Sequence, residues 1–360
     1  MQYVFLTEYW RPPGSPGSTG GTLYNYMLVS ALAQIGQVKV IALNVTHGPL
    51  PDNVELTSVD EPISKFKGFR AFYWTDFLLS ILPAKSAGTV LIATTSTNAV
   101  IRKAKKRGFK VFSIVQAYED YGFRRPGSNF LQKIKSFRKL LLTGQCFSRG
   151  LVHADCVVTN SCYMQNSLTS SLSLDSPPAL LYPPLTLPIE LDYRFTKCAH
   201  DSVGFVNRAG KNLDFVIELA ERVPNKKFYI YGHPLSTQKE LPANVVFKGW
   251  ASDRVEMFKS ARVWLMPSLW YEPFGLVAVE AMSQGCKVAV SDRGGLPEAV
   301  GRFGKVFCDF NTKDWAEWLL EEGNDQNDID LDAHLGGFSV DRFNKTVNDI
   351  FSLSADFFRG

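Results

Sequence analysis

The sequence predicts an α/β protein of two domains, each built on a parallel sheet with helices on both faces. Short β-branched segments alternate with segments of helical length, which is the pattern of a parallel sheet. A proline-rich stretch at 180–195 interrupts the alternation, and the alternation then resumes. The length of 360 residues also exceeds that of one ordinary domain.

The first half begins with a buried-type strand at 2–7, followed by a loop rich in Pro, Gly and Ser. Helical spacing predicts a helix at 22–36, with Thr22 as its cap and Gly36 as its end. Further β-branched runs predict strands at 38–44, 89–95, 110–118 and 155–161. We place the linker at 180–195 and assign residues 1–185 to the first domain.

The second half repeats this arrangement. Apolar runs predict strands at 202–210, 227–232, 244–250, 262–268, 287–295 and 305–310. Helical segments are predicted at 213–223, 254–261 and 276–285. A last helix with an aromatic stripe is predicted at 338–358.

The distribution of charge differs between the two halves, and the cysteine content and hydropathy indicate the cellular compartment. Residues 1–185 hold 19 Lys and Arg against 10 Asp and Glu, whereas residues 186–360 hold 20 against 25. A basic first domain is expected to face an anionic partner. The six scattered cysteines predict buried thiols in a reducing compartment. The chain shows neither a signal peptide nor an apolar run long enough to span a membrane, so we expect a cytoplasmic protein.

Two glutamates mark a candidate ligand site in the second half. Glu272 follows a predicted strand, and Glu280 lies eight residues further on, inside the helix at 276–285. Gly275 would let a ligand approach the helix start, where the free N–H groups of Leu276 and Val277 favour a phosphate. Carboxylates on either side of a phosphate site accept hydrogen bonds from hydroxyls, which predicts binding of a nucleotide sugar.

The stretch from Glu272 to Glu280 resembles the paired-glutamate motif of the family 4 retaining glycosyltransferases, a subset of glycosyltransferase group 1. The resemblance extends to the Gly20-Gly21 loop and to the order of the motifs that follow it. These further motifs are FVNRAGKN, NVVFKGW, WLMPSLWYEPFG and GGLPEAV. The resemblance implies the GT-B fold, in which two Rossmann-like domains face each other across a cleft. It also implies domains at 1–185 and 186–340, with a helix at 341–360 that packs back on the first domain.

The resemblance implies the roles of the site residues. Arg208 and Lys211 are expected to bind the diphosphate and to assist its departure without a metal or cofactor. Glu272, with the backbone at Phe274 and Gly275, is expected to hold the sugar, and Glu280 to hold the ribose. The remaining donor contacts are expected from Gly20 and Gly21 at the β-phosphate and from Trp250 and Ala251 at the base.

The acceptor side departs from the commoner family pattern, which places a histidine near the sugar. This chain instead has IVQAYEDYGF, and its Glu119 is a candidate to orient or deprotonate the acceptor hydroxyl. Similar stretches occur in a subset of the family that acts on bacterial surface polysaccharides. We therefore expect a UDP-hexose such as UDP-glucose as donor, a lipid-linked or oligosaccharide acceptor, and no nucleic acid partner.

Other interpretations stay open. The basic segment 130–142 either lies on anionic lipid at the inner face of the plasma membrane or packs on the core with a basic outer face. Asp328 and Asp330 form an Asp-x-Asp pattern, for which a solvated loop is expected instead of a metal site. The alternatives for the whole chain are a non-catalytic nucleotide-sugar-binding subunit and an NAD-dependent dehydrogenase. The dehydrogenase lacks its glycine fingerprint after the first strand.

Overall fold

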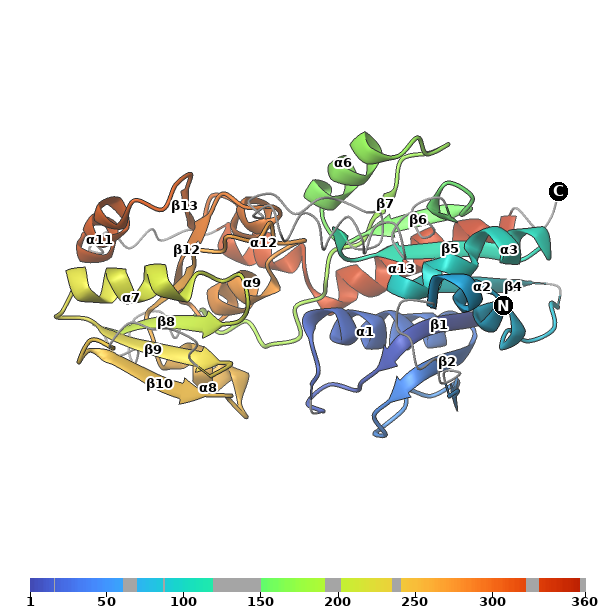
Figure 1. The fold of residues 1–360 in the computed structure, drawn as a ribbon, viewed down its shortest axis with the longest axis horizontal. Coiled ribbons are helices and arrows are strands. Elements are labelled where there is room, and N and C mark those ends of the chain that lie inside the picture. Colours follow the sequence, from blue (N-terminus) through green and yellow to red (C-terminus); the bar gives the residue numbers. More distant parts are fainter. Residues whose placement is uncertain are drawn as a thin grey trace. The chain divides into compact units, whose positions relative to one another are not determined.

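The chain divides into two compact units (Figure 1). The first contains Met1–Pro184 and Val340–Gly360, and the second contains Leu185–Ser339. These limits lie one residue from the boundaries expected at 185/186 and 340/341. The computed structural model describes residues 1–15, 17–60, 70–86, 88–118, 150–191, 202–234, 241–321 and 330–356.

Unit 1 is built on a parallel sheet that, within the described residues, has seven strands in the order β3-β2-β1-β4-β5-β6-β7. Its strands are β1 (Gln2–Trp10), β2 (Gln37–Val45), β3 (Val54–Ser58), β4 (Thr89–Thr94), β5 (Lys110–Val115), β6 (Cys156–Thr159) and β7 (Ala179–Leu180). Its helices are α1 (Gly20–Ile35), α2 (Arg70–Ser80), the 3₁₀ helix η2 (Thr95–Val100), α3 (Ile101–Lys106), α6 (Cys162–Ser171) and α13 (Val340–Asp356). Strand order reverses between β1 and β4, which pair in parallel from Gln2↔Thr89 to Leu6↔Ala93.

Helix α1 starts two residues before the predicted position, and its cap is Thr19 instead of Thr22. The two threonines form a capping box, in which the Thr19 hydroxyl accepts from the Thr22 N–H at 3.3 Å. The Thr22 hydroxyl in turn accepts from the Thr19 N–H at 2.8 Å. The predicted end at Gly36 is confirmed.

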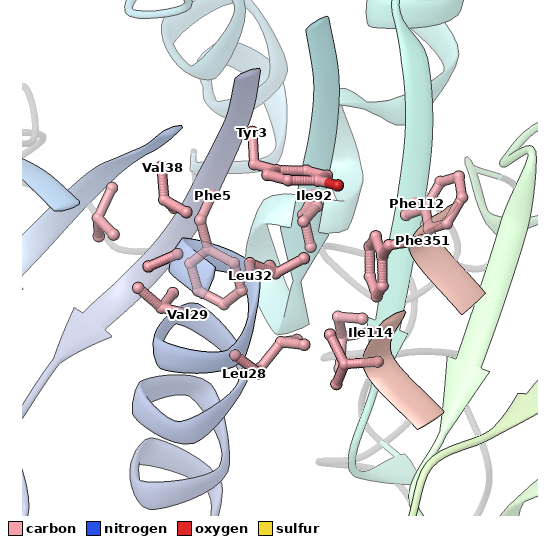
Figure 2. Packing of buried hydrophobic residues seen from close by; sticks show 14 of the residues in the cluster. Tyr3, Phe5, Leu28, Val29, Leu32, Val38, Ile92, Phe112, Ile114 and Phe351 are labelled. Atoms are coloured by element: carbon pink, nitrogen blue, oxygen red, sulfur yellow. The ribbon is translucent and has the colours of Figure 1, made fainter. Parts of the chain in front are cut away.

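The core of unit 1 lies between its sheet and two helices from distant parts of the chain (Figure 2). Leu28, Val29 and Leu32 of α1 are buried against the sheet. The predicted C-terminal helix is confirmed as α13, and its Phe351 ring lies 4.8 Å from the ring of Phe112 in β5. The aromatic stripe of α13 therefore belongs to the core of the first unit.

Unit 2 contains a second parallel sheet, with six described strands in the order β10-β9-β8-β11-β12-β13. Its strands are β8 (Ser202–Asn207), β9 (Lys227–Gly232), β10 (Val245–Gly249), β11 (Val263–Met266), β12 (Lys287–Ser291) and β13 (Lys305–Phe307). Its helices are α7 (Leu213–Arg222), α8 (Arg254–Lys259), α9 (Leu276–Ser283), α10 (Leu296–Val300), α11 (Thr312–Leu320) and α12 (Leu331–Gly336). The expected pair of parallel α/β units is confirmed, and strand order reverses between β8 and β11.

The cysteines depart in part from expectation. Cys286 is buried and Cys156 and Cys162 are half-buried, but Cys308 is exposed, so the prediction of buried thiols is wrong there. Cys308 directly follows β13, the last strand at one edge of the sheet as far as the structure describes the chain. Over the described ranges, none of the helices combines the length and the apolar character needed to cross a bilayer.

Candidate nucleotide-sugar site

Two loops meet where strand order reverses in unit 2. One loop, 208–212, follows β8, and the other, 267–275, follows its neighbour β11. The N–H groups of Leu269 and Trp270 donate to the Gly210 carbonyl at 3.0 and 3.3 Å, so the loops are bonded to each other. Ligands of open parallel sheets bind beyond the carboxyl ends of the strands at such a reversal. This is therefore the candidate ligand site of unit 2.

Lys211 and Glu272, one from each loop, form an ion pair through Nζ and Oε1. The same Glu272 oxygen accepts a hydrogen bond from Ser268 Oγ at 2.8 Å. The side chains of Lys211 and Glu272 are only 19% and 12% exposed, so solvent screens the pair weakly. The predicted diphosphate-binding cation and the predicted sugar-binding carboxylate are thus adjacent and hold each other in place.

The glycine pair Gly294-Gly295 fixes the backbone at Glu272. The Gly295 N–H donates to the Glu272 carbonyl at 2.7 Å, and the Glu272 N–H donates to the Arg293 carbonyl at 3.3 Å. A Cβ at Gly294 would lie 2.1 Å from the Glu272 carbonyl oxygen, and one at Gly295 would lie 2.7 Å from Phe274 Cα. Only glycine permits this approach, so the second glycine pair of the motif positions the first glutamate.

Helix α9 starts where the sequence predicts. Gly275 is its N-cap with φ +117°, a conformation that favours glycine, and Phe274 beside it is buried. Leu276 and Val277 are the first two helical residues, so their N–H groups have no acceptor within the helix. The start of α9 thus supplies the N–H groups and the positive dipole end expected at a phosphate.

Glu280 differs from expectation because it is not accessible in this structure. Its side chain is 0% exposed, and Oε2 pairs with Nη2 of Arg254, whose side chain is 41% exposed. Within the described residues, the buried Oε1 has no hydrogen-bond partner. Burial raises the pKa of the Glu280 carboxyl to about 7, although the charge and hydrogen bond of Arg254 act to lower it. The glutamate expected at the ribose is therefore an enclosed, half-satisfied carboxylate.

Arg208 lies beside an exposed aromatic platform. Its guanidinium carbon is 5.2 Å from the centre of the Trp250 ring, and the His233 ring lies 5.1 Å from the same ring. Trp250 is 58% exposed, and Ala251 next to it is half-buried. Burial lowers the pKa of Arg208, as does the charge of Arg254, while Glu272 raises it. Three cations, Arg208, Lys211 and Arg254, thus occur around the two glutamates.

The candidate phosphate contacts in unit 1 are the first two residues of α1. Gly20 and Gly21 carry N–H groups without an acceptor in the helix. Gly21 also packs closely on buried Gln116, whose Oε1 would lie 2.9 Å from a Cβ at this position. Gln116 Nε2 donates to Asn25 Oδ1 at 2.6 Å, which holds this amide at the end of β5.

Several predictions fall outside the described residues. These are the role of Glu119, the basic segment 130–142 and the position of Asp328. Asp330 is described and pairs with Arg302 on the surface. In the parts of the chain that the structure describes, no three His, Cys, Asp or Glu side chains are grouped so that they could hold a metal ion.

Sequence reasoning did not identify Ser268 or Arg254. Ser268 sits inside the quoted motif, but only the fold brings its hydroxyl to Glu272. Arg254 carried a signal, because it opens helix α8, where the helix dipole disfavours a cation. A basic residue at that position points to a partner outside the helix.

Comparison with known proteins shows similarity in sequence over unit 2 and in fold over the chain. Residues 202–330 match the model of the family described as Glycosyl transferases group 1. The chain is also similar over nearly its whole length to solved structures. HepE of Anabaena, in complex with UDP and glucose, superposes with a TM-score of 0.67 at 17% identity, covering 97% of this chain and 99% of that one. The fold is GT-B. The lipopolysaccharide outer core galactosyltransferase WaaB superposes with a TM-score of 0.66 at 15% identity, covering 98% of this chain and 99% of the other.

Two curated relatives match in sequence over shorter regions. D-inositol 3-phosphate glycosyltransferase of Mycobacteroides abscessus is 31% identical over 138 residues, which are 33% of this chain and 31% of the relative. An uncharacterized 41.2 kDa protein in the cps region of Klebsiella pneumoniae is 31% identical over 163 residues, 41% of this chain and 45% of the relative. The matches thus span less than half the length of these relatives. The match to glycosyltransferase group 1 thus lies in unit 2, and the solved structures show the GT-B fold of the chain.

Proposed function

We propose that this GT-B protein is a retaining glycosyltransferase that moves a hexose from a UDP-sugar, such as UDP-glucose, to an acceptor hydroxyl. One observation carries the proposal: the Lys211–Glu272 ion pair lies where strand order reverses, directly before the start of α9. A cation, a carboxylate and free helix N–H groups in one place match the chemistry of a sugar diphosphate.

Each part of the site has a proposed role in binding the donor. Lys211, Arg208 and the N–H groups of Leu276 and Val277 bind the diphosphate. Glu272 accepts hydrogen bonds from the sugar, whose binding is supported by the adjoining backbone of Phe274 and Gly275. The other proposed contacts are Glu280 at the ribose, Trp250 and Ala251 at the base, and Gly20 and Gly21 at the β-phosphate.

The proposed chemical step takes place on one face of the sugar. The bond between the anomeric carbon and the diphosphate oxygen breaks, and the acceptor oxygen bonds to the same face of that carbon. The departing phosphate takes the proton of the acceptor hydroxyl. Lys211, Arg208 and the N-terminus of α9 stabilise the negative charge that develops on the diphosphate, which is the role a metal plays in other enzymes. Glu119 is proposed to orient the acceptor hydroxyl.

The comparisons support the substrate classes. HepE was solved with UDP and glucose, and with UDP-glucose, which favours a UDP-hexose here. WaaB acts on the lipopolysaccharide outer core, and the Klebsiella relative is encoded in a cps region. We propose a lipid-linked or oligosaccharide acceptor of the bacterial cell envelope, reached at the cytoplasmic face of the membrane through the basic first half.

The proposal is tested by ligand binding and turnover in the purified protein. UDP, GDP and ADP are compared by thermal shift, and we expect UDP to stabilise the protein most. Incubation with UDP-glucose should then release UDP, slowly with water and faster with a suitable acceptor. Binding of UDP without any release from UDP-sugars would assign the chain to the non-catalytic class. Stabilisation by NAD alone would contradict the proposal.

A further inference from the structure

The buried pair Arg254–Glu280 performs a task that the binding roles above do not explain. A carboxylate with 0% exposure and a single hydrogen-bonded oxygen is costly to keep ionised. Among the residues that the structure describes, Arg254 is the one that both bonds to Glu280 and acts on its ionisation, so its charge offsets that cost. The ion pair therefore favours the charged form of the buried Glu280 carboxyl.

The position of Arg254 is unfavourable for its own helix. It is the first residue of α8, and the N-cap Asp253 already satisfies the N–H groups of Val255 and Glu256 at 2.8 and 3.1 Å. A cation at a helix N-terminus opposes the helix dipole. Helix stability consequently gives no reason for an arginine at this position, whereas the bond to Glu280 does.

Arg254 is also the movable member of the pair. Its side chain is 41% exposed, while Glu280 is fully enclosed. A hydroxyl can reach the carboxylate only after the pair shifts, and the exposed guanidinium is the part with room to move. Its charge already acts on Arg208, so it lies near the cations proposed for the diphosphate.

We propose that Arg254 is a positioning residue that favours the ionised form of Glu280 while the site is empty and releases the carboxylate to the ribose hydroxyls when the nucleotide binds. The inference rests on the proposed function, because it requires a nucleotide at Glu280. It adds a residue outside the paired-glutamate motif and predicts how binding depends on pH.

Other charged groups near α9 do not replace Arg254. The segments packed against α9 are β11, β12, α10 and the chain at 188–190, with α8 contributing Arg254. The charged side chains on these segments are Glu190, Glu256, Lys259, Lys287 and Glu298. Among them, Lys259 pairs with Glu190 at 2.8 Å. Burial is the main cause of the raised pKa of Glu280, and among the charged groups of the described residues Arg254 is the one whose charge and hydrogen bond lower it.

The test is UDP binding by calorimetry between pH 6 and pH 9. In the wild-type protein, affinity should fall as the pH drops through about 7, because Glu280 becomes protonated. In Arg254→Met this fall should begin at a higher pH, and at pH 7 UDP should bind about tenfold more weakly, with recovery toward pH 9. Arg254→Lys should stay near the wild-type profile, since the charge is kept.

Proton release gives a second readout that a purely structural role would not change. Comparing binding heats in buffers of different ionisation enthalpy at pH 7 should show about half a proton released from Glu280 in the wild type and nearly one in Arg254→Met. Glu280→Gln sets the baseline, because the UDP phosphate titrates equally in all variants. Should Arg254→Met fail to fold, Arg254→Gln supplies the same loss of charge with a polar side chain of similar length.

Arg302→Met is the matched control, since Arg302 also pairs with one carboxylate but on the surface, with both side chains more than 60% exposed. It should reproduce the wild-type profile. An unchanged midpoint and unchanged proton release in Arg254→Met would overturn the inference while leaving the proposed function intact. Failure of the wild type to bind UDP, GDP and ADP would overturn the proposed function, and the inference with it.

Discussion

Replacing Gly294 with alanine should displace the backbone at Glu272 and so disrupt the candidate site. Gly294 has φ +72°, and a Cβ there would lie 2.1 Å from the Glu272 carbonyl oxygen and 2.6 Å from its nitrogen. Gly249 in the same unit has nearly the same φ, +71°, but nothing lies within 4 Å of its Cβ position. The two alanine variants therefore share the conformational strain and differ in the steric clash.

The expected energies follow from these distances. A non-glycine residue with positive φ costs about 1–2 kcal/mol, and both variants incur this. At Gly294 the segment containing Glu272 must also retreat by about 1 Å to restore ordinary contacts. That movement breaks two backbone hydrogen bonds, Gly295 N–H to Glu272 and Glu272 N–H to Arg293, each worth about 1 kcal/mol. We thus expect Gly294→Ala to lose about 2 kcal/mol more than Gly249→Ala.

Thermal unfolding of the two purified variants measures this difference. For a unit of this size, about 2 kcal/mol corresponds to a Tm lower by about 4–8 °C in Gly294→Ala than in Gly249→Ala. The turnover of UDP-sugar should also be lost in Gly294→Ala, because Glu272 moves away from Lys211. Equal Tm values in the two variants would show that Glu272 is not bonded to Arg293 and Gly295 as described.

Four further predictions address the site. Lys211→Met should reduce turnover by about a hundredfold or more. Adding Glu272→Gln should restore stability, measured by urea unfolding, because the unpaired carboxylate is removed, but it should not restore turnover. Wild-type rates in Lys211→Met would exclude Lys211 as a ligand of the diphosphate. Glu272→Gln should lower kcat with nearly unchanged UDP affinity, whereas Glu280→Gln should raise the KM for the donor and weaken the binding of UDP. Calorimetry and steady-state rates measure these effects. The opposite pattern would mean that the donor binds in the reverse direction. Turnover should persist in EDTA, and a strict requirement for magnesium would contradict the proposed stabilisation of the diphosphate. Since the folded-state pKa of Glu280 is raised from 4.5 to about 7, its contribution to stability is present below pH 4.5 and lost as the pH rises through 7, a loss that unfolding curves of Glu280→Gln should lack.

Local signals in the sequence were sufficient for most elements of the fold. The alternation of strands and helices predicted both parallel sheets, and Gly36 marked the end of α1 correctly. The cap of α1 was assigned to Thr22 because the hydrophobic spacing begins there, yet Thr19 is the residue outside the helix. Such boundary errors arise because both members of a capping box are threonines.

The site was predictable as a set of positions but not as a set of contacts. Lys211 and Glu272 are 61 residues apart, and only the adjacency of β8 and β11 brings them together. The sequence does indicate the burial of Glu280, although its spacing of eight residues from Glu272 gives no sign of it. Its helix, LVAVEAMS, is apolar on nearly every side, and a helix of that kind is buried all round. A lone glutamate in it must find its partner elsewhere, here Arg254.

Helix α13 gives the chain an unusual order of assembly during synthesis. Its Phe343, Val347 and Phe351 complete the core of unit 1, although they leave the ribosome after the whole of unit 2. The nascent first unit must therefore wait with an open apolar face while residues 185–339, a continuous segment, can already fold. During that interval the apolar face over β1 and β5 stays open to solvent, and it is covered only when the last helix has been synthesised and packs on it.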